Sequence, residues 1–135
     1  MLDILTQTLS ITSHQMAPMN QHEKINYVEF PAQDMAATKT FFSRVFSWKF
    51  TDYGPDYCAF SNSGLEGGFF KSAQSSSTQN GSCLVVFYSN ELEKTQQKIV
   101  AAGGKIIKPI FDFPGGRRFH FGDPNGNELA VWSTD

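Results

Sequence analysis

The chain repeats one order of predicted elements, and this internal duplication restricts its fold more than any other feature. A strand, a helix and three further strands are predicted over residues 25–71, and the same order returns over residues 82–135. The two copies are offset by about 56 to 58 residues. Between them lies the polar, uncharged stretch of residues 72–81, whose composition predicts a flexible linker or an exposed loop.

The first copy opens with an alternating strand over residues 25–30, which Pro31 is predicted to end because proline cannot donate a ladder hydrogen bond. Asp34 is predicted to cap a helix over residues 35–46, whose apolar side chains recur at helical spacing. Three short strands complete the copy, at residues 49–53, 57–61 and 67–71.

The second copy follows the same order after the linker. A strand rich in β-branched and aromatic residues is predicted over residues 83–88, and a helix over residues 91–102 is ended by Gly103. A short strand over residues 105–108 and a loop over residues 109–116 then lead to the last two strands.

The chain ends in a predicted hairpin. Two alternating runs, at residues 117–121 and 127–132, flank the sequence Gly-Asp-Pro-Asn-Gly, which is strong turn chemistry. Period-two alternation gives the hairpin an apolar face and a face that mixes ionic with aromatic side chains. The mixed face carries Arg118, His120, Glu128, Ala130 and Trp132.

Each copy has one helix, which can cover one face of its sheet. We therefore expect an α+β fold in which two βαβββ modules, residues 25–71 and 82–135, form a curved, half-open barrel with the helices outside. Residues 23–135 would be one domain behind a flexible N-terminal extension at residues 1–22. The helix-free faces would line a shared cavity, to which Tyr27 and Glu29 belong by alternation.

Charge and cysteine content exclude several classes of partner. The net charge is −2, from 11 basic and 13 acidic residues, which gives no long-range field for nucleic acid or an anionic membrane. No apolar run approaches the roughly 18 residues of a membrane helix. Cys58 and Cys83 form no C-x-x-C motif and are predicted to be buried thiols of a cytoplasmic protein.

The repeat resembles the vicinal oxygen chelate superfamily, which includes glyoxalase I, bleomycin-resistance proteins and extradiol dioxygenases. The resemblance covers residues 24–133 and rests on the order and spacing of several signals. They are Asp34 before a Phe-rich helix that ends in Val45-Phe46-Ser47-Trp48, then Ala102-Gly103-Gly104, then Asp123-Pro124-Asn125-Gly126-Asn127. It implies the half-open barrel, and it implies one divalent metal held by His, Glu or Gln from the first and last strands of each half.

This chain departs from the family at the positions where the resemblance places those ligands. They fall at Tyr27, at Gly68 or Phe69, at Cys83 or Leu84, and at Ala130. A hard divalent cation needs several oxygen or nitrogen donors around one point, and these side chains do not supply them. We therefore expect a protein that binds a small organic molecule in the cavity without a metal or other cofactor.

Seven residues are predicted to contact that molecule: Tyr27, Glu29, Tyr57, Arg118, His120, Glu128 and Trp132. The aromatic members would form walls, and the ionic members would orient the ligand. The ionic residues also allow a structural ion pair between Arg118 and Glu29 or Glu128, and His120 has the right chemistry for a general base.

Two further hypotheses remain open. In one, Glu29, His120 and Glu128 form a displaced site for Fe, Zn, Ni or Mn in a lyase or dioxygenase. In the other, the protein is a dimerising scaffold whose cavity is filled by side chains. We expect the protein that binds a small molecule to be a homodimer, and the linker is long enough for the modules to pair within one chain or across the dimer.

Overall fold

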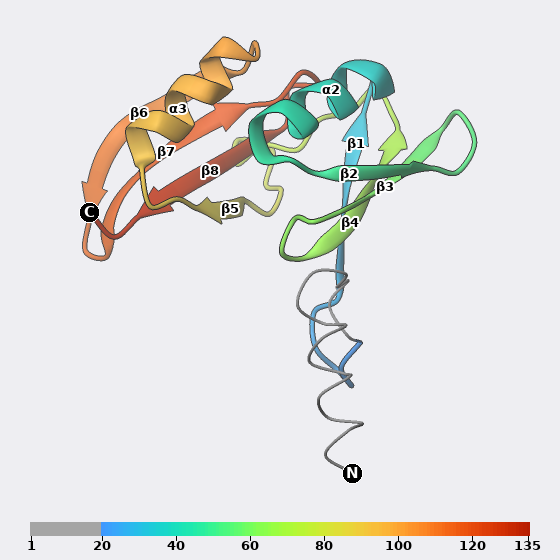
Figure 1. Cartoon of the computed structure of the whole chain (residues 1–135), viewed down its shortest axis with the longest axis horizontal. Coiled ribbons are helices and arrows are strands. Elements are labelled where there is room, and N and C mark those ends of the chain that lie inside the picture. The colour runs from blue at the N-terminus through green and yellow to red at the C-terminus, as the bar shows by residue number, and fades with distance from the viewer. Residues whose placement is uncertain (1–19) are drawn as a thin grey trace, which may run out of the picture.

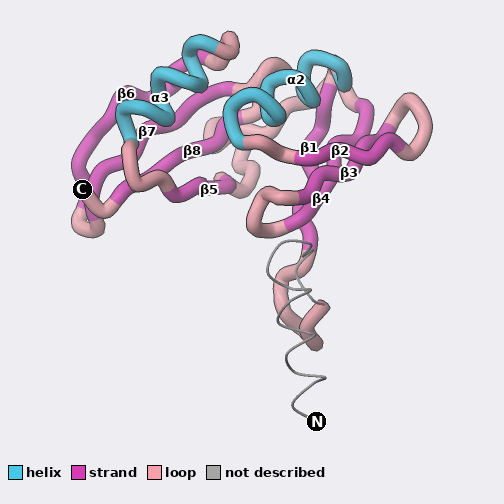
Figure 2. The backbone as a smooth tube through the Cα atoms, viewed as in Figure 1, coloured by secondary structure: helices cyan, strands magenta, loops and turns pink. Residues whose placement is uncertain are grey.

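The computed structural model describes residues 20–135, so all but the last three residues of the predicted extension at residues 1–22 lie outside the described residues. Within the described part, two helices and two four-stranded sheets form the predicted α+β fold. Both helices lie over the same side of the sheets, as Figures 1 and 2 show. None of the helices in residues 20–135 is long and apolar enough to cross a bilayer.

The two modules have the same topology, which confirms the duplication. The first contains β1 (Tyr27–Ala32), α2 (Met35–Phe46), β2 (Lys49–Asp52), β3 (Tyr57–Ser61) and β4 (Glu66–Lys71). The second contains β5 (Val85–Tyr88), α3 (Leu92–Ala101), β6 (Lys105–Phe113), β7 (Gly116–Gly122) and β8 (Glu128–Ser133). The strand orders are β1-β4-β3-β2 and β5-β8-β7-β6, so the first and last strands of each module are parallel neighbours.

Local chemistry explains where the helices begin and end. The Asp34 side chain accepts a hydrogen bond from the Ala37 backbone N–H and caps α2 as predicted. Ser47 then takes a left-handed conformation, with φ of 60°, and ends this helix. Gly103, with φ of +95°, follows α3 and lets the chain turn back into β6.

Two predictions about strands are wrong, and both concern prolines. Pro31 does not end β1, which continues to Ala32. The predicted strand over residues 105–108 extends through Pro109 and most of the predicted loop to Phe113. Both β1 and β6 are edge strands of their described sheets, where a missing N–H is tolerated, and β6 also has register shifts on either side of Lys108.

The two modules share one aromatic core. The ring of Phe46 from α2 stacks on Phe87 of β5 at 4.2 Å, and Phe41 lies 6.2 Å from Phe121 of β7. Helix α2 therefore packs against the second sheet as well as its own. Trp48, which is only 6% exposed, also belongs to this core. Such extensive apolar burial is the main stabilising force of a domain of this size.

A buried amide at the β7–β8 turn joins the second module to the first. Asn127 is fully buried, and its Nδ2 donates to the backbone carbonyl of Pro31 in β1 at 2.8 Å. Its Oδ1 accepts from the backbone N–H of Ser76 at 2.8 Å. The Asp123 carboxylate accepts hydrogen bonds from the backbone and the side chain of Asn127, and so orients it.

Asn125, in the same turn, reaches the start of α2. Its Oδ1 accepts from the backbone N–H groups of Gln33 and Asp34, at 3.0 and 3.1 Å. Its Nδ2 donates to the buried hydroxyl of Thr38 at 2.8 Å. The turn that the sequence predicts as a simple hairpin end is therefore also the polar junction between the modules.

The stretch of residues 72–81 forms a loop, but it is not a free linker. The Ser76 carbonyl accepts from the Glu128 backbone N–H at 2.7 Å, and Thr78 hydrogen-bonds to the Glu128 side chain. Composition alone predicted flexibility because the partners of this stretch lie about 50 residues away in the sequence.

Replacing Asn127 with Ala should destabilise the protein by about 2–3 kcal/mol, because the change leaves the buried Pro31 carbonyl and the partly buried Ser76 N–H without partners. Urea unfolding monitored by tryptophan fluorescence measures this loss. Asn26→Ala is the control, since Asn26 is exposed and bonds only an exposed side chain, so it should change the free energy of unfolding by less than about 0.5 kcal/mol. If the two substitutions lower the free energy of unfolding by equal amounts, the buried hydrogen bonds of Asn127 contribute no more to stability than a surface contact.

Candidate functional site

Three of the predicted site residues form one hydrogen-bonded group on the helix-free face of the first sheet. Tyr57 donates from its hydroxyl to Glu29 Oε2 at 2.8 Å. The Tyr27 hydroxyl lies 2.7 Å from that of Tyr57, and it must be the donor because the single Tyr57 hydrogen is already used. Burial raises the pKa of Tyr57, and its hydrogen bonds to Tyr27 and Glu29 act in the same direction.

A glycine on β4 makes room for this group. Gly68 lies opposite Glu29 in the parallel register and opposite Ala59 in the antiparallel one. A Cβ at this position would lie 2.1 Å from the Tyr57 hydroxyl oxygen, which is far inside van der Waals contact. Tyr57 therefore occupies the space above Gly68, one of the positions where the resemblance places a metal ligand.

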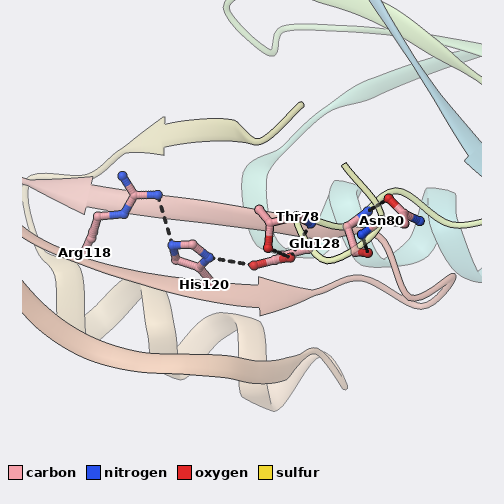
Figure 3. Close-up of polar contacts among 6 residues, drawn as sticks. Thr78, Asn80, Arg118, His120 and Glu128 are labelled. Carbon is pink, nitrogen blue, oxygen red and sulfur yellow. Dashed lines mark hydrogen bonds and ion pairs between the residues drawn. The ribbon is translucent and has the colours of Figure 1, made fainter. Parts of the chain in front are cut away.

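Three other predicted residues form a second group on the helix-free face of the second sheet (Figure 3). Arg118 Nη2 lies 3.0 Å from His120 Nε2, and His120 Nδ1 lies 2.7 Å from Glu128 Oε2. A guanidinium only donates, so we assign His120 Nε2 as the acceptor and place the hydrogen on Nδ1, which donates to the carboxylate. His120 is then a neutral imidazole held between a cation and an anion.

Glu128 is held by the loop between the modules as well as by His120. Its Oε1 accepts from the Thr78 backbone N–H at 2.8 Å and from the Thr78 hydroxyl at 2.9 Å. Burial acts to raise the pKa of Glu128, but the hydrogen bonds from His120 and Thr78 outweigh it and hold the pKa below its ordinary value. Sequence reasoning missed Thr78, because no local pattern connects it to a strand that follows 50 residues later.

The predicted ion pair of Arg118 with Glu29 or Glu128 is wrong for the described residues. Arg118 bonds His120, Glu128 bonds His120 and Thr78, and Glu29 accepts from Tyr57. Among residues 20–135, no hydrogen bond or ion pair joins the first group to the second. The structure thus brings six of the seven predicted residues together as two separate groups of three.

Trp132, the seventh predicted residue, belongs to an aromatic row beside Arg118. It faces Arg118 across the β7–β8 pair. Its ring lies 5.0 Å from that of Tyr88 on β5 and 6.0 Å from that of Phe113 on β6, edge to face in both cases.

A pocket of about 650 Å³ opens between β1 and β5. Its floor consists of core side chains, and Tyr27, Val86 and Tyr88 lie at the strands beside it. The floor includes Val28, Phe30, Trp48, Phe60, Val85 and Phe87. Alternation did not predict this pocket, because it forms where the edges of two sheets meet and not on one face of either.

Cys83 also lines this pocket, and it is exposed. The prediction that both cysteines are buried is therefore wrong for Cys83 and right for Cys58. The reason is that β5 begins at Val85, two residues after Cys83, so this thiol lies in the loop that enters the strand.

The donor set at the positions suggested by the resemblance does not fit a hard divalent cation. The Tyr27 phenol is engaged with Tyr57, Gly68 has no side chain, and Ala130 presents a buried methyl group. For the displaced alternative, His120 and Glu128 are paired while Glu29 lies in the other group. Across residues 20–135, no three His, Cys, Asp or Glu side chains come together in a way that could hold a metal ion.

Comparison with known families agrees with this architecture. The model of the Glyoxalase/Bleomycin resistance protein/Dioxygenase superfamily matches residues 24–131 and confirms the resemblance inferred from the sequence. No curated protein sequence matches the chain.

Solved structures share the fold at low sequence identity. A glyoxalase-related enzyme from Fulvimarina pelagi superposes with a TM-score of 0.69 at 16% identity, over 82% of this chain and 88% of that one. The fosfomycin resistance protein FosX from Listeria monocytogenes gives 0.69 at 18% identity, over 84% and 94%. TioX from Micromonospora sp. ML1 gives 0.63 at 18% identity, over 83% and 99%.

Glu128→Gln should destabilise the protein by about 2–3 kcal/mol at neutral pH. The amide that replaces the carboxylate has one acceptor oxygen and one donor –NH2 group, so it cannot accept hydrogen bonds from both His120 Nδ1–H and the Thr78 backbone N–H. The difference should shrink in acid. The folded-state pKa of Glu128 lies below its ordinary value of 4.5, so its contribution is complete above about pH 4.5 and is lost as the pH falls through the folded-state pKa. Urea unfolding at several pH values measures both effects.

The matched control is Glu93→Gln. Glu93 binds Arg117 at the surface with 57% of its side chain exposed, so solvent screens the pair and the same substitution there should leave the free energy of unfolding nearly unchanged. A Glu128→Gln protein as stable as the wild type at pH 7, or a difference that grows in acid, would contradict the assignment of a buried carboxylate.

Proposed function

The chain belongs to the Glyoxalase/Bleomycin resistance protein/Dioxygenase superfamily, and we propose that it binds a small organic molecule in the pocket between β1 and β5 without a metal. The observation that carries this proposal is the pocket itself. Its volume of about 650 Å³ lies within the range of roughly 300–1,000 Å³ that is usual for small-molecule sites. Its lining is mostly apolar and aromatic, which suits a flat or amphipathic ligand.

Tyr27 lines the pocket, and the hydrogen-bonded chain that runs from it through Tyr57 to Glu29 would orient the bound molecule. The Tyr27 hydroxyl donates to Tyr57 and keeps its oxygen free to accept from a ligand. Glu29, which accepts from Tyr57 through Oε2, has a second carboxylate oxygen on the exposed face. The Tyr27 oxygen and the Glu29 carboxylate of the first module could thus accept hydrogen bonds from donor groups of a ligand.

A metal-dependent lyase or dioxygenase using Glu29, His120 and Glu128 is the alternative. A FosX variant from Listeria monocytogenes was solved with Mn(II) and a dihydroxypropylphosphonic acid, which favours metal chemistry for that protein. In this chain the Nε2 lone pair of His120 is occupied by Arg118, whose positive charge also opposes a nearby cation. We therefore keep ligand binding without a metal as the proposal.

We further propose that the protein is a cytoplasmic homodimer. β1 and β5 are edge strands of their described sheets, and apolar side chains on or beside them are exposed, including Ile25, two residues before β1, at 84% and Tyr88 of β5 at 50%. Edge strands with exposed apolar side chains favour pairing with another chain. Cys58 and Cys83 are free thiols, as expected of a protein kept in a reducing compartment.

The neutral apolar dye Nile red should bind the pocket and slow the reaction of Cys83 with a thiol reagent by about tenfold or more, because Cys83 lines the pocket. Cys58 is buried and burial raises its pKa, so Cys83 dominates the labelling, and Cys83→Ser verifies this. Mass spectrometry follows labelling, and fluorescence follows dye binding.

Val86→Trp should fill the pocket and weaken dye binding by about tenfold or more, since Val86 lies in its wall. Val100→Trp is the control, because Val100 is also an exposed valine (51%, against 41% for Val86) but lies on α3, away from the pocket. Unchanged labelling of Cys83 at saturating dye, with Val86→Trp binding like the wild type, would rule out this pocket as the ligand site.

Protein purified without a histidine tag should contain Fe, Zn, Ni and Mn well below one ion per chain, because the donor set does not fit them. Elemental analysis by mass spectrometry measures this content. His120→Ala and Glu29→Ala provide the comparison. A stoichiometric metal in the wild type that disappears in both variants would replace the proposal with the metal-dependent alternative.

A further inference from the structure

Arg118 is a half-buried cation whose charge no described carboxylate balances. Its neighbour Arg117 binds Glu93 at 2.5 Å, whereas Arg118 takes part in no ion pair among residues 20–135. Its one hydrogen-bond acceptor in that range is His120 Nε2, a neutral nitrogen. Its Nε is buried without any partner. Such a group is costly unless an acceptor completes it.

The carboxylate on this face is already committed. Glu128 uses Oε2 for His120 and Oε1 for Thr78. A second cation stands nearby, since Lys108 Nζ lies 4.3 Å from the centroid of the Phe111 ring and the Arg118 guanidinium carbon lies 5.8 Å from the same ring. Lys108 also forms no ion pair within the described residues. This part of the face therefore has an excess of positive charge.

The free donors of Arg118 have the geometry that a carboxylate needs. Nη1 has no acceptor in the described part of the chain and, unlike Nε, is not enclosed. Together with the second hydrogen of Nη2, it forms a planar pair of parallel donors at the end of the side chain. Such a pair binds both oxygens of a carboxylate in charge-assisted hydrogen bonds.

An aromatic row leads from Arg118 to the pocket. The Arg118 guanidinium lies 6.0 Å from the Phe113 ring, Phe113 contacts Trp132, and Trp132 contacts Tyr88, which lines the pocket. The three rings, joined by two edge-to-face contacts, offer an apolar surface to a flat molecule. Its acidic end would then meet Arg118.

We propose that the ligand is an aromatic carboxylate, whose carboxylate binds the guanidinium of Arg118 and whose ring lies along Trp132 and Tyr88 toward the pocket. This inference rests on the proposed function, because it names the chemical class of the molecule that the same pocket holds. His120 holds Nη2 of Arg118 through one of its two hydrogens, and Lys108 adds positive charge above Phe111.

Naphthoate and its neutral amide, naphthamide, form a matched pair of probes with the same ring. Naphthoate should bind the wild-type protein about tenfold or more tightly than naphthamide, and Arg118→Gln should abolish this preference while leaving naphthamide binding unchanged. Arg118→Lys should keep part of the preference, because it retains the charge but not the fork. Isothermal titration calorimetry measures each affinity, and circular dichroism confirms that each variant is folded.

Arg117→Gln is the control, since Arg117 is the adjacent arginine and is occupied by Glu93. It should bind both probes like the wild type. An Arg118→Gln protein that keeps the full preference for naphthoate overturns the inference, while its binding of naphthamide still supports the proposed function. Failure of both probes and of Nile red to bind the wild type overturns the inference and the proposed function together.

Glu29→Gln tests the other partner that Arg118 could have, Glu29 of a second copy. Under our inference it leaves the sedimentation of the protein unchanged, because Arg118 then pairs with the ligand and not with Glu29. Sedimentation velocity shows whether Glu29→Gln and Arg118→Gln are monomers or dimers. If both substitutions dissociate a dimer and neither changes probe binding, Arg118 pairs with Glu29 of the second copy, and the inference is wrong.

Discussion

The buried amide of Asn127 is the interaction on which the relative placement of the two modules depends. It donates to the Pro31 carbonyl at the end of β1 and accepts from Ser76 in the loop between the modules. An unpaired buried amide is costly, so these hydrogen bonds favour one arrangement of the modules. Other arrangements with similar apolar contacts would leave the amide unpaired. The shared aromatic core supplies most of the stabilisation, but apolar contacts are not directional. Directionality comes from this turn, and the pocket between β1 and β5 depends on it.

The fold was predictable because its signals are local. Each signal depends on a few neighbouring residues: the strand and helix periodicities, the Asp34 cap and the Asp-Pro-Asn-Gly turn. The duplication repeats the order of strands and helix in the second half of the chain. The errors share one cause: they concern partners far away in the sequence. Pro31 is tolerated because β1 is an edge strand, and the loop over residues 72–81 is held by Asn127 and Glu128. Neither fact is present in the local sequence.

The sequence predicted which side chains of the candidate site share a face of the sheet, but not which of them bond to one another. Alternation correctly grouped Arg118, His120, Glu128 and Trp132, because strand geometry fixes which side chains share a face. It could not say that His120 would separate Arg118 from Glu128, since that choice depends on side-chain reach and on Thr78 from another segment. The pocket was missed for a related reason. It lies between two sheet edges, and the relation between edges is set by the junction and the core.

The first module shows why the proposed loss of metal binding would not be reversed by a single substitution. Tyr57 fills the space above Gly68 and holds both Tyr27 and Glu29 by hydrogen bonds. A histidine or glutamate placed at residue 68 would collide with the Tyr57 ring, and one placed at residue 27 would remove the donor to Tyr57. The replacements are therefore mutually dependent, and a metal site would require at least residues 27, 57 and 68 to change together. That coupling favours a face adapted to organic ligands over a metal site that has lost one ligand.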